Sequence, residues 1–284
     1  RRSYIVEFTE KASEIVENMV EYSWLQVNSS EHILRMSHID SKETLMEILA
    51  STSDFINDEN TLVLAIDQEG NYYASDRRAG RWVQTRMLTE KAGFRQQAVA
   101  GIPHKGARTY LVFMERLEDP LSVGEDDCFI HYLLAAVDIE SMQDKISVGG
   151  FGDKCYTYLV NDDGSRLYKY TYRDHFIEGY NILNSFRDYN IIHGESYEDF
   201  VQDLKQDRNG AFEFEYVDAD GREENWFVAN AAISSAEWHV LLFVPTDVLG
   251  FNSALLMKRT LRFFVTVSAA VVAMVAIIIV VTMI

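Results

Sequence analysis

Near the start of the chain, apolar residues recur every three or four positions. This spacing puts them on one side of a helix. An apolar stripe needs a partner surface, and two partners fit it equally well. One is the body of the same chain, and the other is a second copy, joined through a coiled-coil-like seam whose register breaks at Gln26. The stripe consists of Ile5, Phe8, Ala12, Ile15, Met19 and Tyr22.

A second helix is predicted from Lys42 to Phe55. Its start resembles a capping box, in which Asp40 and Glu43 satisfy the first backbone N–H groups. The residues expected to face inward are Leu45, Ile48 and Leu49.

The pattern changes to strands at Thr61. The segment TLVLAIDQEGNYYASD joins an apolar run to an aromatic-rich run through a polar turn closed by Gly70, which is typical of a β-hairpin. Two long strands follow in ARTYLVFMERL and CFIHYLLAAVD. The second strand ends at Asp138, which can cap a helix. The apolar side of that helix is formed by Ile139, Met142 and Ile146.

The same order of elements then returns. KCYTYLVNDDGSRLYKYTY repeats the strand, the acidic turn with Gly164 and the tyrosine-rich strand, and FEFEYV, ENWFVANAAI and EWHVLLFVPTDVLG supply three more strands and a helix. The sequence therefore predicts an α+β fold with two tandem antiparallel sheets and flanking helices. The predicted parts are a helical region over 1–58, a first unit over 59–146, a second unit over 147–250, and a juxtamembrane and transmembrane helix over 251–284.

The end of the sequence predicts a membrane span. Phe263 to Ile284 contains no charge, proline or glycine and is long enough to cross a hydrocarbon layer of about 30 Å. A helix that begins near Thr246 is expected to run into it. The positive-inside rule would put the preceding Lys258, Arg259 and Arg262 in the cytoplasm.

Composition excludes some functions. The formal charge of −18 disfavours binding to nucleic acid, because phosphate would meet a repulsive field. Cys128 and Cys155 are the only cysteines, and a disulfide or two buried thiols are both open. No familiar catalytic, nucleotide, cofactor or metal motif occurs. GGFG at 149–152 is expected to be a linker, and the acidic run at 161–164 a hairpin turn.

Three guanidinium groups and three aromatic rings lie close together in an otherwise acidic chain. Such groups form a small-molecule pocket, in which arginine binds carboxylate or phosphate and the rings give an apolar lining. The alternative is that the arginines pair with surface carboxylates and the tryptophan covers the sheet. The group consists of Tyr72, Tyr73, Arg78, Arg81, Trp82 and Arg86.

The whole chain resembles the double Cache sensor domain, a PAS-like extracytoplasmic fold of bacterial histidine kinases, diguanylate cyclases and chemoreceptors. The segments that carry the resemblance are LVLAIDQEG, LLAAVDIESM, YTYLVNDDGSRLY and EWHVLLFVPTDVL. The resemblance implies a small-molecule sensor without catalysis of its own, held at the cell membrane with its soluble part outside the cytoplasm. The expected topology rests on this resemblance and not on the basic flank, because the positive-inside rule compares both flanks of a helix. A tail-anchored interaction module and a membrane-bound hydrolase with an unrecognised site are the rival interpretations.

The resemblance also implies a site in the first unit. Amino-acid-binding members of the family have an Arg-x-Trp pair and an Asp at the end of the last strand. Here Arg81 is directly next to Trp82, whereas Asp138 matches the terminal Asp. In this reading Arg81 holds a carboxylate, Asp138 holds an ammonium group, and Tyr73, Trp82 and Tyr110 form the remainder.

Overall fold

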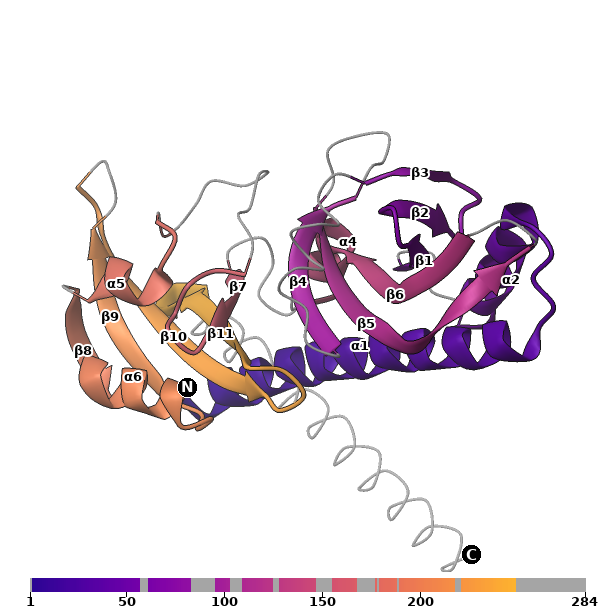
Figure 1. Cartoon of the computed structure of the whole chain (residues 1–284). Coiled ribbons are helices and arrows are strands. Elements are labelled where there is room, and N and C mark those ends of the chain that lie inside the picture. The colour runs from indigo at the N-terminus through magenta and orange to yellow at the C-terminus, as the bar shows by residue number, and fades with distance from the viewer. Residues whose placement is uncertain are drawn as a thin grey trace, which may run out of the picture.

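The computed structural model consists of two antiparallel sheets arranged along one long helix (Figure 1). The first unit contains a six-stranded sheet and the second unit a five-stranded sheet. The structure describes residues 2–56, 61–82, 95–102, 109–124, 128–146, 155–167, 177, 179–187, 189–217 and 221–248.

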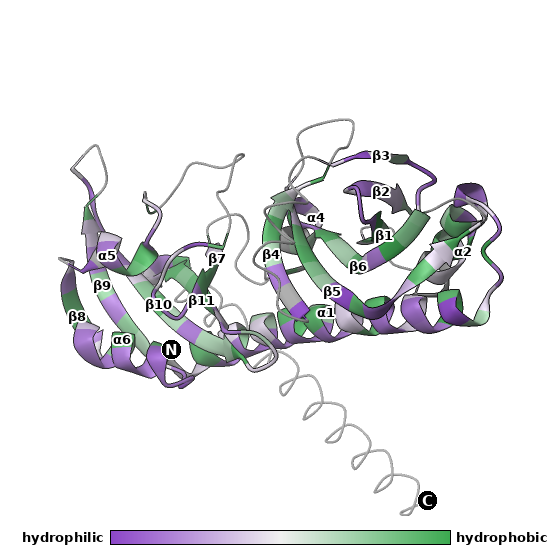
Figure 2. Ribbon diagram, viewed as in Figure 1, coloured by the Kyte–Doolittle hydropathy of each residue, from purple (hydrophilic) through white to green (hydrophobic). Residues whose placement is uncertain are grey.

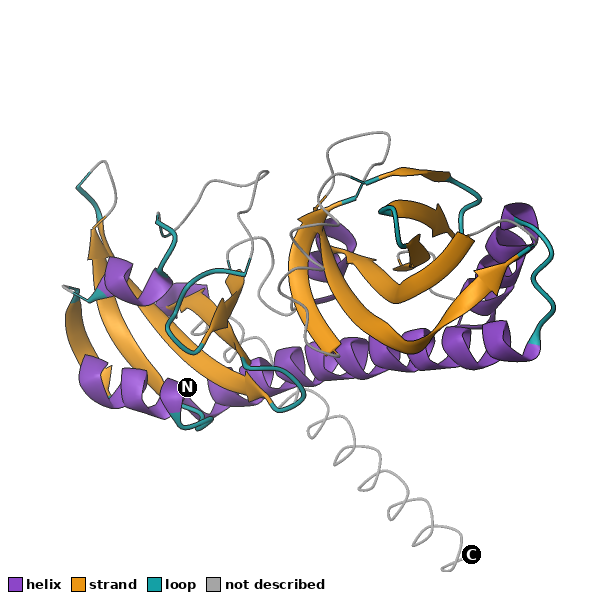
Figure 3. Ribbon diagram, in the orientation of Figure 1, coloured by secondary structure: helices purple, strands orange, loops and turns teal. Residues whose placement is uncertain are grey.

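The described elements include helices before, between and beside the sheets (Figure 3). The helices are α1 (Arg2–Met36), α2 (Lys42–Ile56), α4 (Ile139–Ile146), α5 (Ile182–Phe186) and α6 (Tyr197–Lys205). The strands of the first sheet are β1 (Thr61–Asp67), β2 (Asn71–Ala74), β3 (Ala79–Arg81), β4 (Arg95–Gly101), β5 (Thr109–Val123) and β6 (Cys128–Asp138). The strands of the second sheet are β7 (Tyr156–Asn161), β8 (Asn190–Gly194), β9 (Ala211–Val217), β10 (Glu223–Ile233) and β11 (Trp238–Pro245).

Helix α1 packs on both sheets and divides the stripe predicted from the sequence. Ile5 and Ala12 are fully buried against the body of the chain, as the first interpretation of the stripe expects. Ile15 and Tyr22 instead lie on the outer side of the helix and are exposed. The helix continues through Gln26, so its buried face is longer than predicted. That face carries Ile5, Ala12, Val16, Val20, Val27 and Leu34.

Helix α2 begins at the predicted Lys42 and ends at Ile56, one residue beyond the predicted Phe55, but its cap differs. Ser41, rather than Asp40, accepts the backbone N–H of Thr44 at 3.1 Å. Asp40 accepts a hydrogen bond from the Thr44 hydroxyl instead. A serine directly before the helix can reach the orphan N–H groups, and this gives the first turn its cap.

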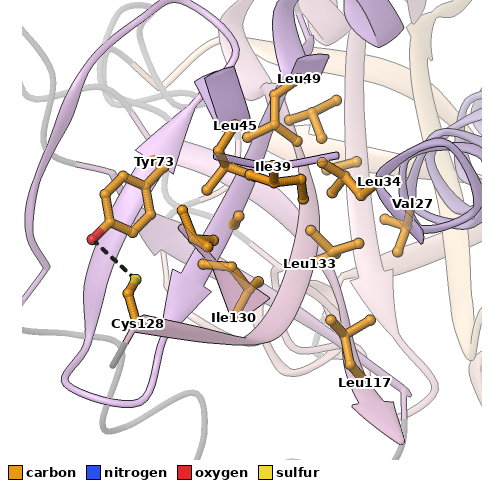
Figure 4. Packing of buried hydrophobic residues seen from close by; sticks show 14 residues of the cluster. Val27, Leu34, Ile39, Leu45, Leu49, Tyr73, Leu117, Cys128, Ile130 and Leu133 are labelled. Carbon is orange, nitrogen blue, oxygen red and sulfur yellow. Dashed lines mark hydrogen bonds between the residues drawn. The ribbon is translucent and has the colours of Figure 1, made fainter. Parts of the chain in front are cut away.

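The first sheet has the strand order β3-β2-β1-β6-β5-β4, and all neighbours are antiparallel. Successive side chains point to opposite faces, so each strand contributes to two cores. One core lies beneath α1 and α2, where Leu34, Leu45 and Leu49 meet Ile130 and Leu133 (Figure 4). The other core is on the face turned away from α1, and it forms the site described below.

The second sheet has the order β7-β11-β10-β9-β8. Helix α6 packs Phe200 and Leu204 onto one face of it and leaves its polar residues outside, which is why the helix is mainly purple in Figure 2. The predicted turn at 161–164 is present, closed by the N–H of Gly164 bonding to the carbonyl of Asn161 at 2.8 Å.

A single core joins the two units. It contains Val16 and Val20 of α1 together with strand residues from both sheets. At its centre Phe113 of β5 lies between two indoles, with centroid distances of 5.6 Å to Trp24 and 6.3 Å to Trp238 of β11. The two sheets are therefore in direct side-chain contact.

Several predictions concern residues outside those described. They are the span at 263–284 with its basic flank, the linker at 149–152, and Arg86. Within the described residues, no helix is both long and apolar enough to cross a membrane. No disulfide joins Cys128 to Cys155, so the disulfide alternative is wrong in this structure.

Candidate functional site

The outer face of the first sheet carries a buried cluster of aromatic and apolar side chains. Tyr72, Trp82 and Tyr110 supply the rings, with exposed fractions of 6%, 2% and 2%. These rings come from β2, from the residue after β3, and from β5. Hairpin pairing and strand alternation bring them to one face, because Tyr72 is opposite Gly80 of β3. A Cβ at Gly80 would make an ordinary van der Waals contact with the Tyr72 ring at 3.4 Å, so position 80 faces that ring directly.

Arg78 adds a positive charge to this cluster. It lies in the β2–β3 turn, where Arg77 adopts a φ of 65° and the N–H of Ala74 bonds to the carbonyl of Arg78 at 2.8 Å. Its Nε donates to Asp76 at 2.6 Å. This hydrogen bond is the main reason that the pKa of Arg78 is raised, and Tyr72 and Tyr110 add to the rise electrostatically. The guanidinium group therefore lies near both phenol rings.

Asp138 places a carboxylate at the end of β6 on the same face. It is directly opposite Tyr110 in the β5–β6 register and is 4% exposed. Its Oδ1 accepts the backbone N–H of Glu140 at 3.0 Å, which confirms its predicted role as the cap of α4. The site thus contains a guanidinium group and a carboxylate near the same tyrosine.

Trp82 closes one side of the cluster. Its indole Nε1 donates to the carbonyl of Gly101 at 3.0 Å, and its backbone N–H bonds to the carbonyl of Gly70 at 3.1 Å. Both contacts fix the ring in place, so this wall of the site is preorganised.

Two of the five predicted site residues lie elsewhere. Arg81 pairs with Asn71 in the β2–β3 register, next to the Gly80 position that faces the cluster, and it is exposed. Tyr73 points into the core beneath α2, where its hydroxyl is 3.1 Å from Asp67 and 3.8 Å from the Cys128 sulfur. Burial is the main cause that raises the pKa of Tyr73, followed by the contact with Cys128. The dashed line in Figure 4 marks that contact.

Arg78 is the residue that sequence reasoning did not select. It was present in the predicted constellation, but the choice between Arg78 and Arg81 depends on the register of β3. That register follows from the left-handed residue Arg77, which no local sequence pattern predicts, because arginine rarely adopts this conformation.

The described residues contain no group of three or more His, Cys, Asp or Glu side chains that could hold a metal ion. The groups brought together on this face are of the kinds that line small-molecule sites in general: a charged donor, a charged acceptor, phenol hydroxyls and an apolar ring.

The sequence matches no protein-family model and no curated protein. Several solved structures are similar in fold. The extracellular domain of mmHK1S-Z3, described as a histidine kinase, has a TM-score of 0.54 at 13% identity, over 89% of this chain and 97% of that chain. The ligand-binding domain of the Pseudomonas aeruginosa PAO1 amino acid chemoreceptor PctB, in complex with L-Gln, has a TM-score of 0.55 at 14% identity, over 87% of this chain and 92% of that chain. The periplasmic sensory domain of the Campylobacter jejuni chemoreceptor Tlp1 has a TM-score of 0.50 at 14% identity, over 86% of this chain and 94% of that chain.

These similarities cover 86–89% of this chain and 92–97% of the other chains. The fold is therefore that of extracytoplasmic sensor domains from histidine kinases and chemoreceptors. The fold predicted from the resemblance is confirmed.

Proposed function

We propose that this chain is the extracytoplasmic sensing part of a bacterial transmembrane receptor and that it has no catalytic activity of its own. The observation that carries the proposal is the meeting of Arg78, Asp138 and three buried rings on one face of the first sheet. The fold supports it, because the similar structures are sensory domains.

The ligand class follows from the charges. A guanidinium group binds carboxylate through forked hydrogen bonds, and Asp138 can accept from an ammonium group. PctB was solved with L-Gln and L-Arg, and Tlp3 of Campylobacter jejuni with L-norvaline. We therefore propose an α-amino acid or a related carboxylate as the ligand, with Arg78 taking the role predicted for Arg81.

Replacing Arg78 with glutamine is expected to weaken amino-acid binding by roughly 10- to 100-fold, because a hydrogen bond to a charged group contributes about 1.5–3 kcal/mol. The matched control is Arg81→Gln. It removes the same charge from a residue that lies three positions after Arg78 and does not join the cluster. We expect the control to bind within about twofold of the parent chain. Isothermal titration calorimetry against the twenty amino acids and their decarboxylated analogues measures both. Equal losses in the two variants would show that the site is elsewhere.

We further propose a homodimer in which α1 supplies the seam. Its outer side carries apolar residues at heptad-related spacing, with Tyr22 58% and Met36 76% exposed. Ile15 and Leu25 continue the same exposed side. The predicted membrane anchor would hold two copies parallel and at high local concentration, which favours a weak helical seam.

A cysteine at Tyr22 is expected to form an intermolecular disulfide under mild oxidation. The background is Cys128→Ala with Cys155→Ala, which removes both native thiols. Glu21→Cys serves as the control, because the adjacent position points about 100° away around the helix. Non-reducing gel electrophoresis of the membrane-bound chain separates the cross-linked dimer from the monomer in each variant. Cross-linking of equal yield at both positions would argue against a defined seam.

A further inference from the structure

His239 is a completely buried histidine with unsatisfied ring nitrogens. It lies near the start of β11, on the sheet face that α6 covers, and has an exposed fraction of 0%. Neither Nδ1 nor Nε2 has a hydrogen-bond partner among the described residues. A buried polar group without partners is costly, so native proteins rarely keep one that serves no purpose.

Two carboxylates face this ring at distances just beyond a hydrogen bond. Nε2 is 3.4 Å from Oδ1 of Asp162 and 3.6 Å from Oδ1 of Asp207. Asp162 belongs to the turn after β7, whereas Asp207 follows α6 and holds a left-handed φ of 53°. Oδ1 of Asp162 is itself buried and has no hydrogen-bond partner among the described residues. His239, Asp162 and Asp207 therefore lie close enough to attract one another electrostatically, but they form no hydrogen bond with one another.

The other neighbours of His239 are neutral or paired. Its partners across the sheet are Val160 of β7 and Ala232 of β10. Asn230 of β10 is satisfied by the N–H of Gly210 and the carbonyl of Arg208. The Arg208 side chain is paired with Asp203 at 2.6 Å. Asp162 and Asp207 are thus the charged groups that act on the imidazole among the described residues.

Asp162 also lines a cleft of about 660 Å³ between the two units. The walls come from Trp24 of α1, from Arg95 and Gln97 of β4 in the first unit, and from the turns of the second unit. The side chain of Asp162 is half exposed, so one carboxylate contacts both the buried ring and the cleft.

We propose that His239 is a proton-binding site that gives this protein acidity as a second input, separate from the small-molecule site. When Nε2 and Nδ1 both carry protons, the ring gains a positive charge and attracts Asp162 and Asp207. Nε2 carries one proton, and a charge-assisted hydrogen bond has a length of about 2.7–2.9 Å, so the Asp162 carboxylate, at 3.4 Å, must move toward β11 by about half an ångström to accept it. The turn that carries Asp162 is then drawn away from the cleft between the units.

The direction of the pH dependence follows from the surroundings of the ring. Burial lowers the pKa of His239, while the attraction of Asp162 and Asp207 opposes this effect in part. Since the folded-state pKa lies below that of the unfolded chain, the contribution of His239 to stability is complete above about pH 6.5. It is lost as the pH falls from there through the folded-state pKa. The input therefore responds to acidification below the usual histidine range.

The first test measures the protonation of His239 directly. The 284-residue chain with ¹³Cε1-labelled histidine is titrated by NMR, and the His239 signal is the one missing from His239→Gln. We expect a midpoint below about 6.5, and a still lower midpoint in Asp162→Asn, which loses an attracting charge. The control is Asp163→Asn, the exposed neighbour, which should leave the midpoint unchanged. An ordinary midpoint, or one insensitive to Asp162→Asn, would overturn the proposal.

The second test asks whether protonation of His239 changes the width of the cleft between the two units. Spin labels are attached to cysteines at Gln97 and Ser235, two residues on opposite walls of the cleft, in the background without native thiols. Their distance distribution is compared at about pH 7.5 and one unit below the His239 midpoint, where most of the ring is protonated. We expect a shift that is absent in His239→Gln and reduced in Asp162→Asn. No shift in the parent, or an equal shift in His239→Gln, would contradict the proposal, and neither result affects the amino-acid site.

Discussion

Replacing Phe113 with alanine is expected to lower the free energy of unfolding by about 3–5 kcal/mol. The ring is fully buried between Trp24 and Trp238, so its removal leaves a cavity that two sheets and a helix cannot close together. Typical domains are stable by only about 5–15 kcal/mol, and a loss of this size removes a large part of that margin. Urea unfolding followed by circular dichroism measures the change.

Phe129→Ala is the matched control for this prediction. It deletes the same ring from the neighbouring strand β6, at a position that is 40% exposed. We expect a loss below about 1 kcal/mol there, because little apolar area returns to water and no cavity forms. If both variants lost equal stability, the core shared by the two sheets would contribute no more to the free energy of unfolding than a half-exposed ring does.

Gly164→Ala is expected to destabilise the second unit by about 2–5 kcal/mol, the sum of backbone strain and overpacking. Gly164 has a φ of +79°, which disfavours any side chain. A Cβ there would also lie 2.3 Å from Cγ of the buried Leu183. The leucine cannot retreat, because it is packed in the core beneath α5.

Gly221→Ala separates these two causes. Its φ of +77° is nearly the same, but a Cβ at Gly221 would meet no atom of the described residues within 4 Å. We expect only the backbone part there, about 1–2 kcal/mol. Thermal unfolding of both variants, measured side by side, gives the steric part as the difference. The contact with Leu183 would be unimportant if the two melting temperatures fell equally.

The sequence predicts the elements whose pattern is long or strongly punctuated. Strands β5 and β6 contain long apolar runs, and α1 has a stripe of several turns, so the sequence is enough to recognise their type. The short helix α6 was not predicted, although Ser196 followed by Asp199 marks its cap, because only Phe200 and Leu204 are buried. Strand β4 was missed for a related reason: its sequence RQQAVAG offers no clear alternation of apolar and polar residues.

The site was predictable in kind but not in detail. The sequence placed arginines and aromatic rings after the first hairpin, and Trp82, Tyr110 and Asp138 do lie on one face of the sheet. The sequence could not decide between Arg78 and Arg81, since a shift of one residue in β3 moves a side chain to the opposite face. The extent of the two units, 59–146 and 147–250, stays a prediction.

Helix α1 also determines how this protein can be recombined with its relatives. Its 35 residues extend roughly 52 Å, and they place Ile5 in the core of the second unit and Leu34 in the core of the first. The first half of α1 thus completes the core of the second unit. A chimaera that exchanges only residues after α4 would join a foreign sheet to the native first half of α1. Exchange of the whole second unit therefore requires two segments, the first half of α1 and the residues after α4.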